Sequence, residues 1–128
     1  MIRLLFVSVA VGGLAGFPAY AQDAAAGERT FMICRACHQI GPGAHDAIGP
    51  VLNGVVGRKA GTYPGYQYTD ANKNSGLTWT PEELDKYLTS PQTVVPHTKM
   101  IFPGLKDPAQ RQNVITYLEQ FNPDGSKK

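Results

Sequence analysis

The sequence contains few cysteines and little net charge, and both shortages exclude whole classes of protein. Its 2 cysteines are too few for a disulfide-rich miniprotein and for a zinc site built from cysteines alone, which needs four. The 12 Lys and Arg residues nearly balance the 10 Asp and Glu residues, whereas a nucleic-acid-binding domain needs a clustered basic face. Hydrophobic residues make up 42% of the chain, so we expect a folded core rather than disorder.

Residues 1–21 have the pattern of a secretory signal peptide. Arg3 precedes an uncharged stretch that ends in Ala19-Tyr20-Ala21, a small-x-small cleavage site. The strongly apolar part, residues 4–14, is shorter than the stretch of about 20 residues that a membrane span needs. We therefore expect cleavage before Gln22, which could then cyclise, and export of one domain, residues 22–128. An uncleaved membrane anchor is the alternative.

The remaining residues predict short helices separated by long loops. No segment alternates apolar and polar residues for long, and no repeat is present. Clear N-terminal signals are Thr80-Pro81-Glu82-Glu83, a capping box with proline at the first helical position, and Asp107-Pro108. The predicted fold class is all-α, with loops over residues 39–49 and 91–106. The predicted helices are residues 23–37, 69–74, 80–90 and 107–121.

Such a fold has an energetic problem. A few short helices with more than about forty residues of irregular loop bury little apolar area against the entropy of ordering them. Because there is no disulfide framework, we expect a large apolar group inside the fold to supply the missing core.

The segment Cys34-Arg35-Ala36-Cys37-His38 has the C-x-x-C-H pattern of c-type haem attachment. On one helical turn the two thiols lie on the same side and can form thioethers with the two haem vinyl groups, and His38 follows as the proximal iron ligand. A thioredoxin-like redox pair would need a strand–helix setting, and a zinc site would need a second pair of ligands. The sequence offers neither, so it predicts one covalently attached haem c.

The second iron ligand has several candidates. Met100 lies in a proline-bounded loop that could cover the far face of the porphyrin, and its thioether is a soft ligand that stabilises ferrous iron. His97 is the second choice. Met32, just before the motif, is expected to fill the core, and His45, in a glycine-rich loop, is expected to be exposed.

From Cys34 to about Phe121 the chain resembles class I cytochromes c of the mitochondrial type and bacterial cytochromes c2. The resemblance implies a small cytochrome c fold wrapped around one haem, with crossing N- and C-terminal helices. It implies haem attachment through Cys34 and Cys37, with His38 and Met100 as axial ligands. The resembling stretches are residues 49–61, 68–74, 76–79 and 96–102.

The same resemblance implies roles for further residues around the haem. The carbonyl of Pro50 should accept the other ring N–H of His38, and Gly27 and Phe31 should meet Tyr117 and Leu118 where the terminal helices cross. Haem propionates need donors when they are buried. The expected propionate side is Arg58, Tyr68, Asn72, Trp79 and Thr98, and the rest of the pocket is Pro50, Tyr87 and Phe102.

The function implied by the resemblance is that of an electron carrier, not an enzyme. We expect a soluble periplasmic monomer that takes single electrons from a cytochrome bc complex or a periplasmic dehydrogenase. A terminal oxidase or a photosynthetic reaction centre would accept them. A haem enzyme or gas sensor with an open iron position is one alternative, and a thiol–disulfide oxidoreductase using Cys34 and Cys37 is another.

Redox partners are expected to dock at the exposed haem edge, at Lys99 and Lys106, with help from Arg35. Mitochondrial members surround this edge with lysines that steer their partners. This chain instead has Ile33, Gln92 and Thr93 at the matching positions. We therefore expect steering to be weaker and less dependent on salt.

Overall fold

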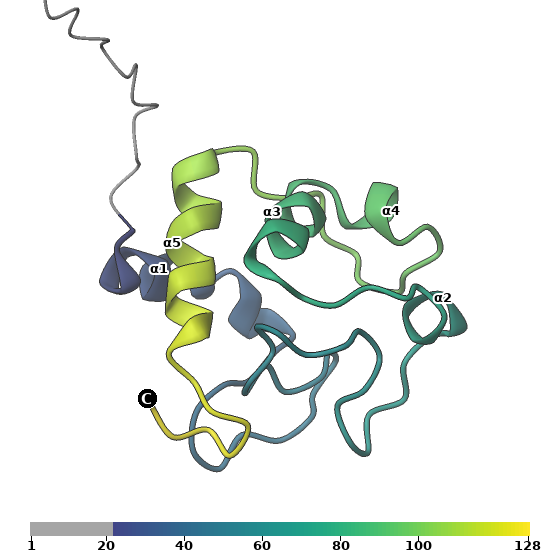
Figure 1. Cartoon of the computed structure of the whole chain (residues 1–128), viewed down its shortest axis with the longest axis horizontal. Coiled ribbons are helices and arrows are strands. Elements are labelled where there is room, and N and C mark those ends of the chain that lie inside the picture. Colours follow the sequence, from purple (N-terminus) through teal and green to yellow (C-terminus); the bar gives the residue numbers. More distant parts are fainter. Residues whose placement is uncertain (1–21) are drawn as a thin grey trace, which may run out of the picture.

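The computed structural model describes residues 22–128, which form short helices joined by long loops (Figure 1). In this part of the chain the only β-structure is two isolated bridges, Lys59–Thr78 and Phe121–Lys127, so the all-α prediction is confirmed. No helix among these residues has the length and apolarity needed to cross a membrane. The predicted signal peptide lies outside the described residues. The helices are α1 (Ala24–Phe31), the 3-10 helix η1 (Cys34–Ala36), α2 (Asp70–Lys73), α3 (Pro81–Thr89), α4 (Pro91–Val94) and α5 (Pro108–Glu119).

Side-chain caps start the three longer helices where the sequence predicts them. The carboxylate of Asp23 accepts hydrogen bonds from two backbone amides of α1. The hydroxyl of Thr80 accepts the amide N–H of Glu83 at 3.2 Å, and Asp107 accepts that of Ala109 at 2.9 Å. These contacts satisfy amides that have no partner inside the helix.

Two helix boundaries differ from the prediction. The first helix ends at Phe31 instead of continuing to about Cys37, and the C-x-x-C-H segment forms the separate turn η1. The amides of Cys37 and His38 both donate to the carbonyl of Cys34, at 3.0 and 2.9 Å, which tightens the turn. The loop predicted over residues 91–106 contains α4, because Pro91 occupies a first helical position.

Met32, predicted in the core, is 62% exposed, because the chain leaves α1 at this residue.

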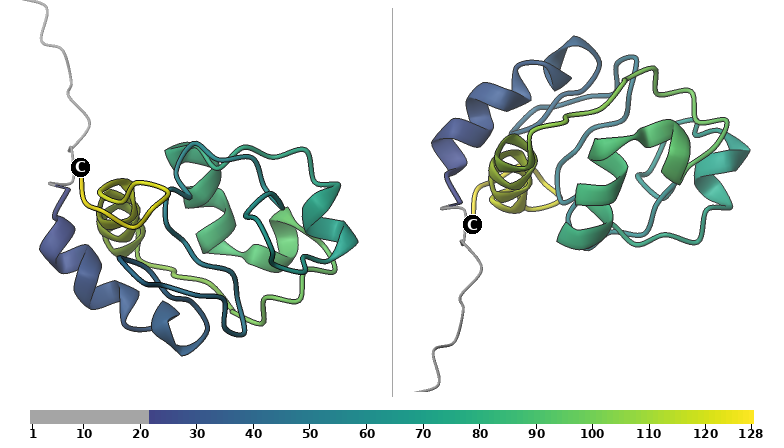
Figure 2. Two further views of the ribbon diagram at one scale, coloured as in Figure 1. Left: turned by 90° about the horizontal axis from the view of Figure 1, so that it is seen from below. Right: turned by 90° about the horizontal axis from the view of Figure 1, so that it is seen from above.

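Helices α1 and α5 cross at one side of the molecule, as both views of Figure 2 show. Phe31 is fully buried, and its ring centroid lies 5.4 Å from that of Tyr117. Gly27 lies so close to α5 that an added Cβ would overlap the carbonyl of Asn113 and come within 2.8 Å of the Tyr117 Cβ. The glycine therefore allows the backbones to approach closely. Leu118, also expected at this crossing, is buried in the same hydrophobic core as Phe31.

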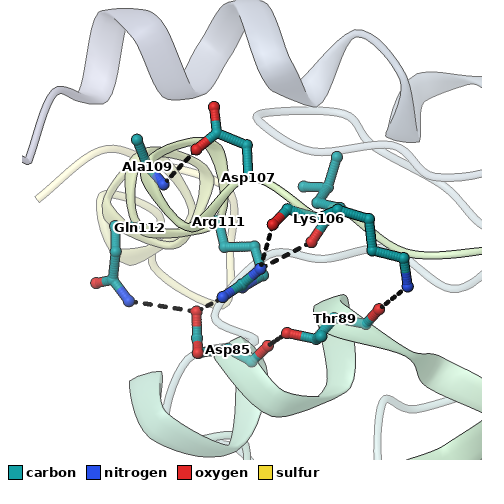
Figure 3. A network of polar contacts seen from close by, with 8 residues as sticks. Asp85, Thr89, Lys106, Asp107, Ala109, Arg111 and Gln112 are labelled. Atoms are coloured by element: carbon teal, nitrogen blue, oxygen red, sulfur yellow. Dashed lines mark hydrogen bonds and ion pairs between the residues drawn. The ribbon is translucent and has the colours of Figure 1, made fainter.

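A polar network joins α3, α5 and the loop that leads into α5 (Figure 3). The Arg111 side chain, only 11% exposed, donates from Nε to Asp85 at 2.8 Å and from a terminal nitrogen to the carbonyl of Leu105 at 2.9 Å. Lys106 donates to the carbonyl of Thr89 at 2.8 Å. These contacts fix the loop that follows Met100 to both helices, so they hold one wall of the interior in place.

The α1–α5 crossing predicts the effect of Gly27→Ala. Helix propensity alone would stabilise the alanine variant by about 1 kcal/mol, but overpacking against the backbone of Asn113 costs about 3 kcal/mol. We expect a net loss of about 2 kcal/mol in the free energy of unfolding, measured by denaturant titration of the haem-loaded protein. Glu28→Ala, at an exposed position of the same helix, is the control and should change it by less than about 0.5 kcal/mol. An alanine variant as stable as the parent would contradict the close crossing.

Candidate haem-binding site

One cavity of about 510 Å³ lies inside the fold, and its walls come from η1, α2, α3, α5 and the long loops between them. Its volume is in the range of cofactor and ligand pockets. The cavity is lined by every residue that the sequence analysis proposes for haem attachment, iron ligation, the propionate side and the pocket. These are Cys34, Cys37, His38, Pro50, Arg58, Tyr68, Asn72, Trp79, Tyr87, Thr98, Met100 and Phe102.

Only some of the candidate iron ligands line the cavity. His38 and Met100 line it, whereas Met32, His45 and His97 do not. His97 adopts φ of 68° and is exposed, as is His45. The two residues favoured by the sequence are therefore the candidates that the fold brings to the cavity.

Gly49 and Pro50, in the wall of the cavity, hold the His38 ring in place. Its Nδ1 lies 2.7 Å from the carbonyl oxygen of Pro50. Because a carbonyl only accepts, Nδ1 carries the proton, and Nε2 keeps its lone pair for a metal. Gly49 lies against the imidazole, and an added Cβ would lie 2.7 Å from Nδ1. Burial lowers the pKa of His38, which favours the neutral ring that binds metals.

Both cysteines line the same cavity and are half-buried. Burial raises the pKa of the Cys34 thiol to about 11. A redox-active cysteine needs a lowered pKa that populates the thiolate, so the environment of Cys34 does not suit thiol–disulfide exchange. The placement of both sulfurs beside His38 suits covalent attachment of a cofactor instead.

Met100 is held from two sides. The hydroxyl of Tyr87 donates to its sulfur, with Oη and Sδ 3.3 Å apart. The amide of Gln92 donates to the carbonyls of Thr98 and Met100, at 3.1 and 3.3 Å. In the sequence Gln92 stands out only as the replacement of a lysine, because no local pattern reveals a contact between a helix and a loop. In the fold, Gln92 links α4 to the loop that contains Met100, which we call the methionine loop.

Two polar side chains of the cavity wall, Arg58 and Tyr68, form hydrogen bonds to backbone groups of the chain. Arg58 donates to the carbonyls of Asn53 and Val51, at 2.7 and 3.4 Å, so two of its donor groups are already used. The hydroxyl of Tyr68 accepts the amide of Tyr63 at 3.1 Å. Burial, the largest cause in each case, lowers the pKa of Arg58 and raises that of Tyr68.

Asn72 carries a buried side-chain oxygen that has no hydrogen-bond partner. Unpartnered buried polar atoms are rare in folded proteins, and each calls for an explanation. A side-chain amide has both donor and acceptor groups, and its two orientations are assigned from the surrounding network. An amide in this position therefore fits a polar group of a bound molecule, such as a carboxylate at the edge of a haem.

Tyr66 is a cavity residue that the sequence analysis missed. It lines the cavity, its hydroxyl donates to the carbonyl of Ile48 at 2.7 Å, and its ring meets that of Tyr68 edge-on at 4.9 Å. Tyr66 lies in a glycine-containing loop with no periodicity, so no sequence signal marks it as a residue that lines the cavity. Taken together, the apolar walls, the paired sulfurs, the oriented imidazole, the thioether and the unpartnered amide fit a covalently attached haem.

Comparisons with known proteins agree with this fit. A family model described as Cytochrome c matches residues 24–122. A cytochrome c2 from Blastochloris viridis is 56% identical over 111 residues, which are 87% of this chain and 87% of that protein. A cytochrome c2 from Rhodoblastus acidophilus is 56% identical over 107 residues, which are 84% of this chain and 100% of that protein.

Solved structures show the same fold. The structure of cytochrome c2 from Rhodospirillum centenum has a TM-score of 0.74 and 40% identity, and the match covers 79% of this chain and 99% of that one. Cytochrome cH from Methylobacterium extorquens has a TM-score of 0.71 and 48% identity, with 76% and 97% covered. The chain therefore belongs to the cytochrome c family: it is an electron carrier and not an enzyme, and it carries a covalently attached haem c.

Proposed function

We propose that this protein is a soluble periplasmic carrier of the cytochrome c2 type, whose haem iron is held between His38 and Met100. The observation that supports this ligation is the cavity itself. It contains the imidazole oriented by Pro50 and the thioether contacted by Tyr87, while the other candidate ligands lie outside it. Bound haem supplies an iron that changes between the ferrous and ferric states.

The chain's own residues tune and protect this iron. The contact with the Pro50 carbonyl holds the His38 ring in one orientation and makes it a stronger electron donor. The hydroxyl of Tyr87 donates a hydrogen bond to a sulfur lone pair of Met100, so less electron density is left for the iron. With His38 and Met100 both holding the iron, no position would be left for a substrate, and little rearrangement would accompany electron transfer.

The remaining roles follow the chemistry of the cavity wall. Cys34 and Cys37 form the thioether bonds. Tyr87, Pro50 and Phe102 form the apolar pocket. The remaining donors of Arg58, together with Tyr68, Asn72, Trp79 and Thr98, would hold the propionates, and the side-chain amide of Asn72, whose buried oxygen has no partner in the chain, supports this end as the polar one.

The partners of this carrier are other redox proteins. We propose a cytochrome bc complex or a periplasmic dehydrogenase as donor, and a terminal oxidase or a photosynthetic reaction centre as acceptor. The relatives named cytochrome c2 support redox proteins in general as its partners. The leader pattern of residues 1–21 supports export to the periplasm and cleavage before Gln22.

The variant Met100→Ala tests the ligation. We expect it to lose the weak far-red band of ferric iron–thioether bonding, to bind carbon monoxide quickly when reduced, and to lower its reduction potential. Loss of a methionine ligand should lower the potential by on the order of 100 mV, which corresponds to roughly a 50-fold change in the redox equilibrium. Absorption spectra and a potentiometric titration measure these changes. An unchanged far-red band would overturn the proposed ligand.

Tyr87→Phe is the matched control, because it removes the contact with the sulfur and keeps the sulfur itself. The far-red band should remain. A hydrogen bond to the sulfur weakens its donation to ferric iron, so removing the bond should stabilise the ferric state. A contact worth about 1 kcal/mol corresponds to a potential lowered by about 40 mV.

The intact mass of protein exported by its own leader tests cleavage and attachment together. We expect the mass of residues 22–128 plus one haem, with the further loss of one ammonia if Gln22 cyclises. Thiol-specific alkylation should add nothing, because both sulfurs are used. A mass that retains residues 1–21 would contradict cleavage and indicate an anchored protein.

A further inference from the structure

Asp46 does not line the cavity, yet its carboxylate contacts the segment that orients His38. Its Oδ1 accepts a hydrogen bond from the amide of Val51, at 3.2 Å. Asp46 itself is exposed, whereas Val51 is only 1% exposed, so a surface charge contacts an interior amide. A hydrogen bond from a backbone amide to a carboxylate is roughly twice as strong as one between neutral groups.

The Val51 amide belongs to the same peptide unit as the Pro50 carbonyl. That carbonyl is the group that accepts the Nδ1 proton of His38, at 2.7 Å. The peptide is trans, so its N–H and its C=O point in opposite directions. A single peptide unit therefore connects the carboxylate of Asp46 on one side to the imidazole of a proposed iron ligand on the other.

A carboxylate on the amide of this peptide changes the charge on its carbonyl oxygen. The lone pair of a peptide nitrogen is delocalised toward the oxygen. A negative charge that accepts from the N–H favours the resonance form with more negative charge on the oxygen, and hydrogen bonds linked in this way strengthen each other by about 10–30%. The Pro50 carbonyl therefore becomes a stronger acceptor for the Nδ1 proton of His38.

Other hydrogen bonds hold this peptide in place. The amide of Gly49 donates to the carbonyl of Cys37 at 2.8 Å, and the amide of Leu52 donates to the carbonyl of Gln39 at 3.0 Å. These contacts tie the segment to the residues on either side of the proposed iron ligand. The contribution of Asp46 is therefore to the charge distribution of the peptide rather than to its position, and variants at this residue should fold.

The carboxylate of Asp46 takes part in none of the ion pairs formed by residues 22–128. Those pairs are Lys73–Asp70, Lys86–Glu83 and Arg111–Asp85. The ring of the neighbouring His45 contacts the backbone carbonyl of Asp46, at 3.2 Å. The negative charge is therefore not neutralised by a paired cation of this part of the chain, and it can polarise the peptide.

We propose that Asp46 is a positioning residue that lowers the reduction potential of the haem iron through the Pro50–Val51 peptide. The carboxylate strengthens the bond between the Pro50 carbonyl and the Nδ1 proton, so Nε2 of His38 becomes a stronger electron donor. A stronger donor stabilises ferric iron more than ferrous iron. The inference rests on the proposed ligation by His38 and extends it to a residue outside the cavity.

The variant Asp46→Asn removes the charge and keeps an oxygen that can accept from the Val51 amide. We expect the ratio of ferrous to ferric protein at a fixed solution potential to rise about threefold, which is about 30 mV for one electron. Potentiometric titrations at about 0.01 M and about 1 M salt measure this ratio, while the Debye length falls from about 30 Å to about 3 Å. A shift carried by hydrogen bonds should persist. An unchanged ratio, or a shift that loses more than half of its size at high salt, would overturn the proposal.

A second measurement reports on the His38 ring directly. It is needed because the charge of Asp46 also acts on the cavity wall: burial is the main cause that raises the pKa of Tyr68, and this charge is a smaller cause in the same direction. By NMR of fully reduced, isotope-labelled protein, the Nδ1 proton of His38 should exchange with solvent about threefold faster in Asp46→Asn, because its bond to Pro50 is weaker. An exchange rate equal to that of the parent would contradict the role of the peptide.

Asp70→Asn makes the same chemical change at a side chain that is 92% exposed and paired with Lys73. This control leaves the contact between Asp46 and Val51 in place, so the Nδ1 proton should exchange at the parental rate. A control that alters both the potential and the exchange rate as much as Asp46→Asn would refute the proposal. The far-red band separates the two proposals. Its absence from the ferric parent would overturn the ligation, whereas its presence in parent and variant with unchanged readouts would overturn the role of Asp46 alone.

Discussion

The packing of loop side chains against a covalently attached haem is the interaction on which the rest of this structure depends. The segments between η1 and α3 have almost no regular structure, yet Leu52, Val55 and Trp79 from these segments all face one cavity. Conformational entropy opposes the ordering of such loops. A rigid apolar cofactor, tied to the chain at Cys34 and Cys37, gives their side chains a common surface to pack against.

The polypeptide fixes the positions of the two proposed iron ligands, His38 and Met100. Gly49 and Pro50 hold His38 by contact with its ring and by a carbonyl at 2.7 Å. The methionine loop is held by Tyr87 from α3 and by Gln92 from α4. The Arg111–Asp85 pair then fixes the return of this loop to α5 (Figure 3). Each restraint limits movement of the two proposed iron ligands, which suits a one-electron carrier. Membership of the cytochrome c family excludes the thiol–disulfide oxidoreductase that the cysteine pair alone left open.

Much of the fold and the candidate site could be predicted from the sequence, because the strongest signals are local. The caps at Asp23, Thr80 and Asp107 depend on a few neighbouring residues, and the C-x-x-C-H spacing has a mechanical reason of its own. Met100 was favoured by its loop chemistry, and the fold places it in the cavity. The functional roles of the lining residues stay predictions.

The remaining features depend on tertiary contacts that no local pattern contains. The predicted first helix is too long because the amides of Met32 and Ile33 donate to carbonyls three residues earlier, those of Arg29 and Thr30, where the α-helix ends. Met32 at this point is exposed. Lys99, a predicted docking residue, donates to the carbonyl of Gln67, which lies 32 residues away in sequence, and no local pattern indicates this contact. Ile33, Ile48 and Ile101, which line the cavity, likewise come from three segments that only the folded chain brings together.

The most direct test of the central role of haem is amide hydrogen exchange on residues 22–128 produced without haem attachment. The account predicts that the amides of α3 and α5, protected in the haem-loaded protein, exchange within about tenfold of unfolded-chain rates, since the loops and cavity walls lose their common packing surface. Protection of those amides by more than about a thousandfold, equivalent to roughly 4 kcal/mol, would show that the polypeptide folds on its own and would contradict this account.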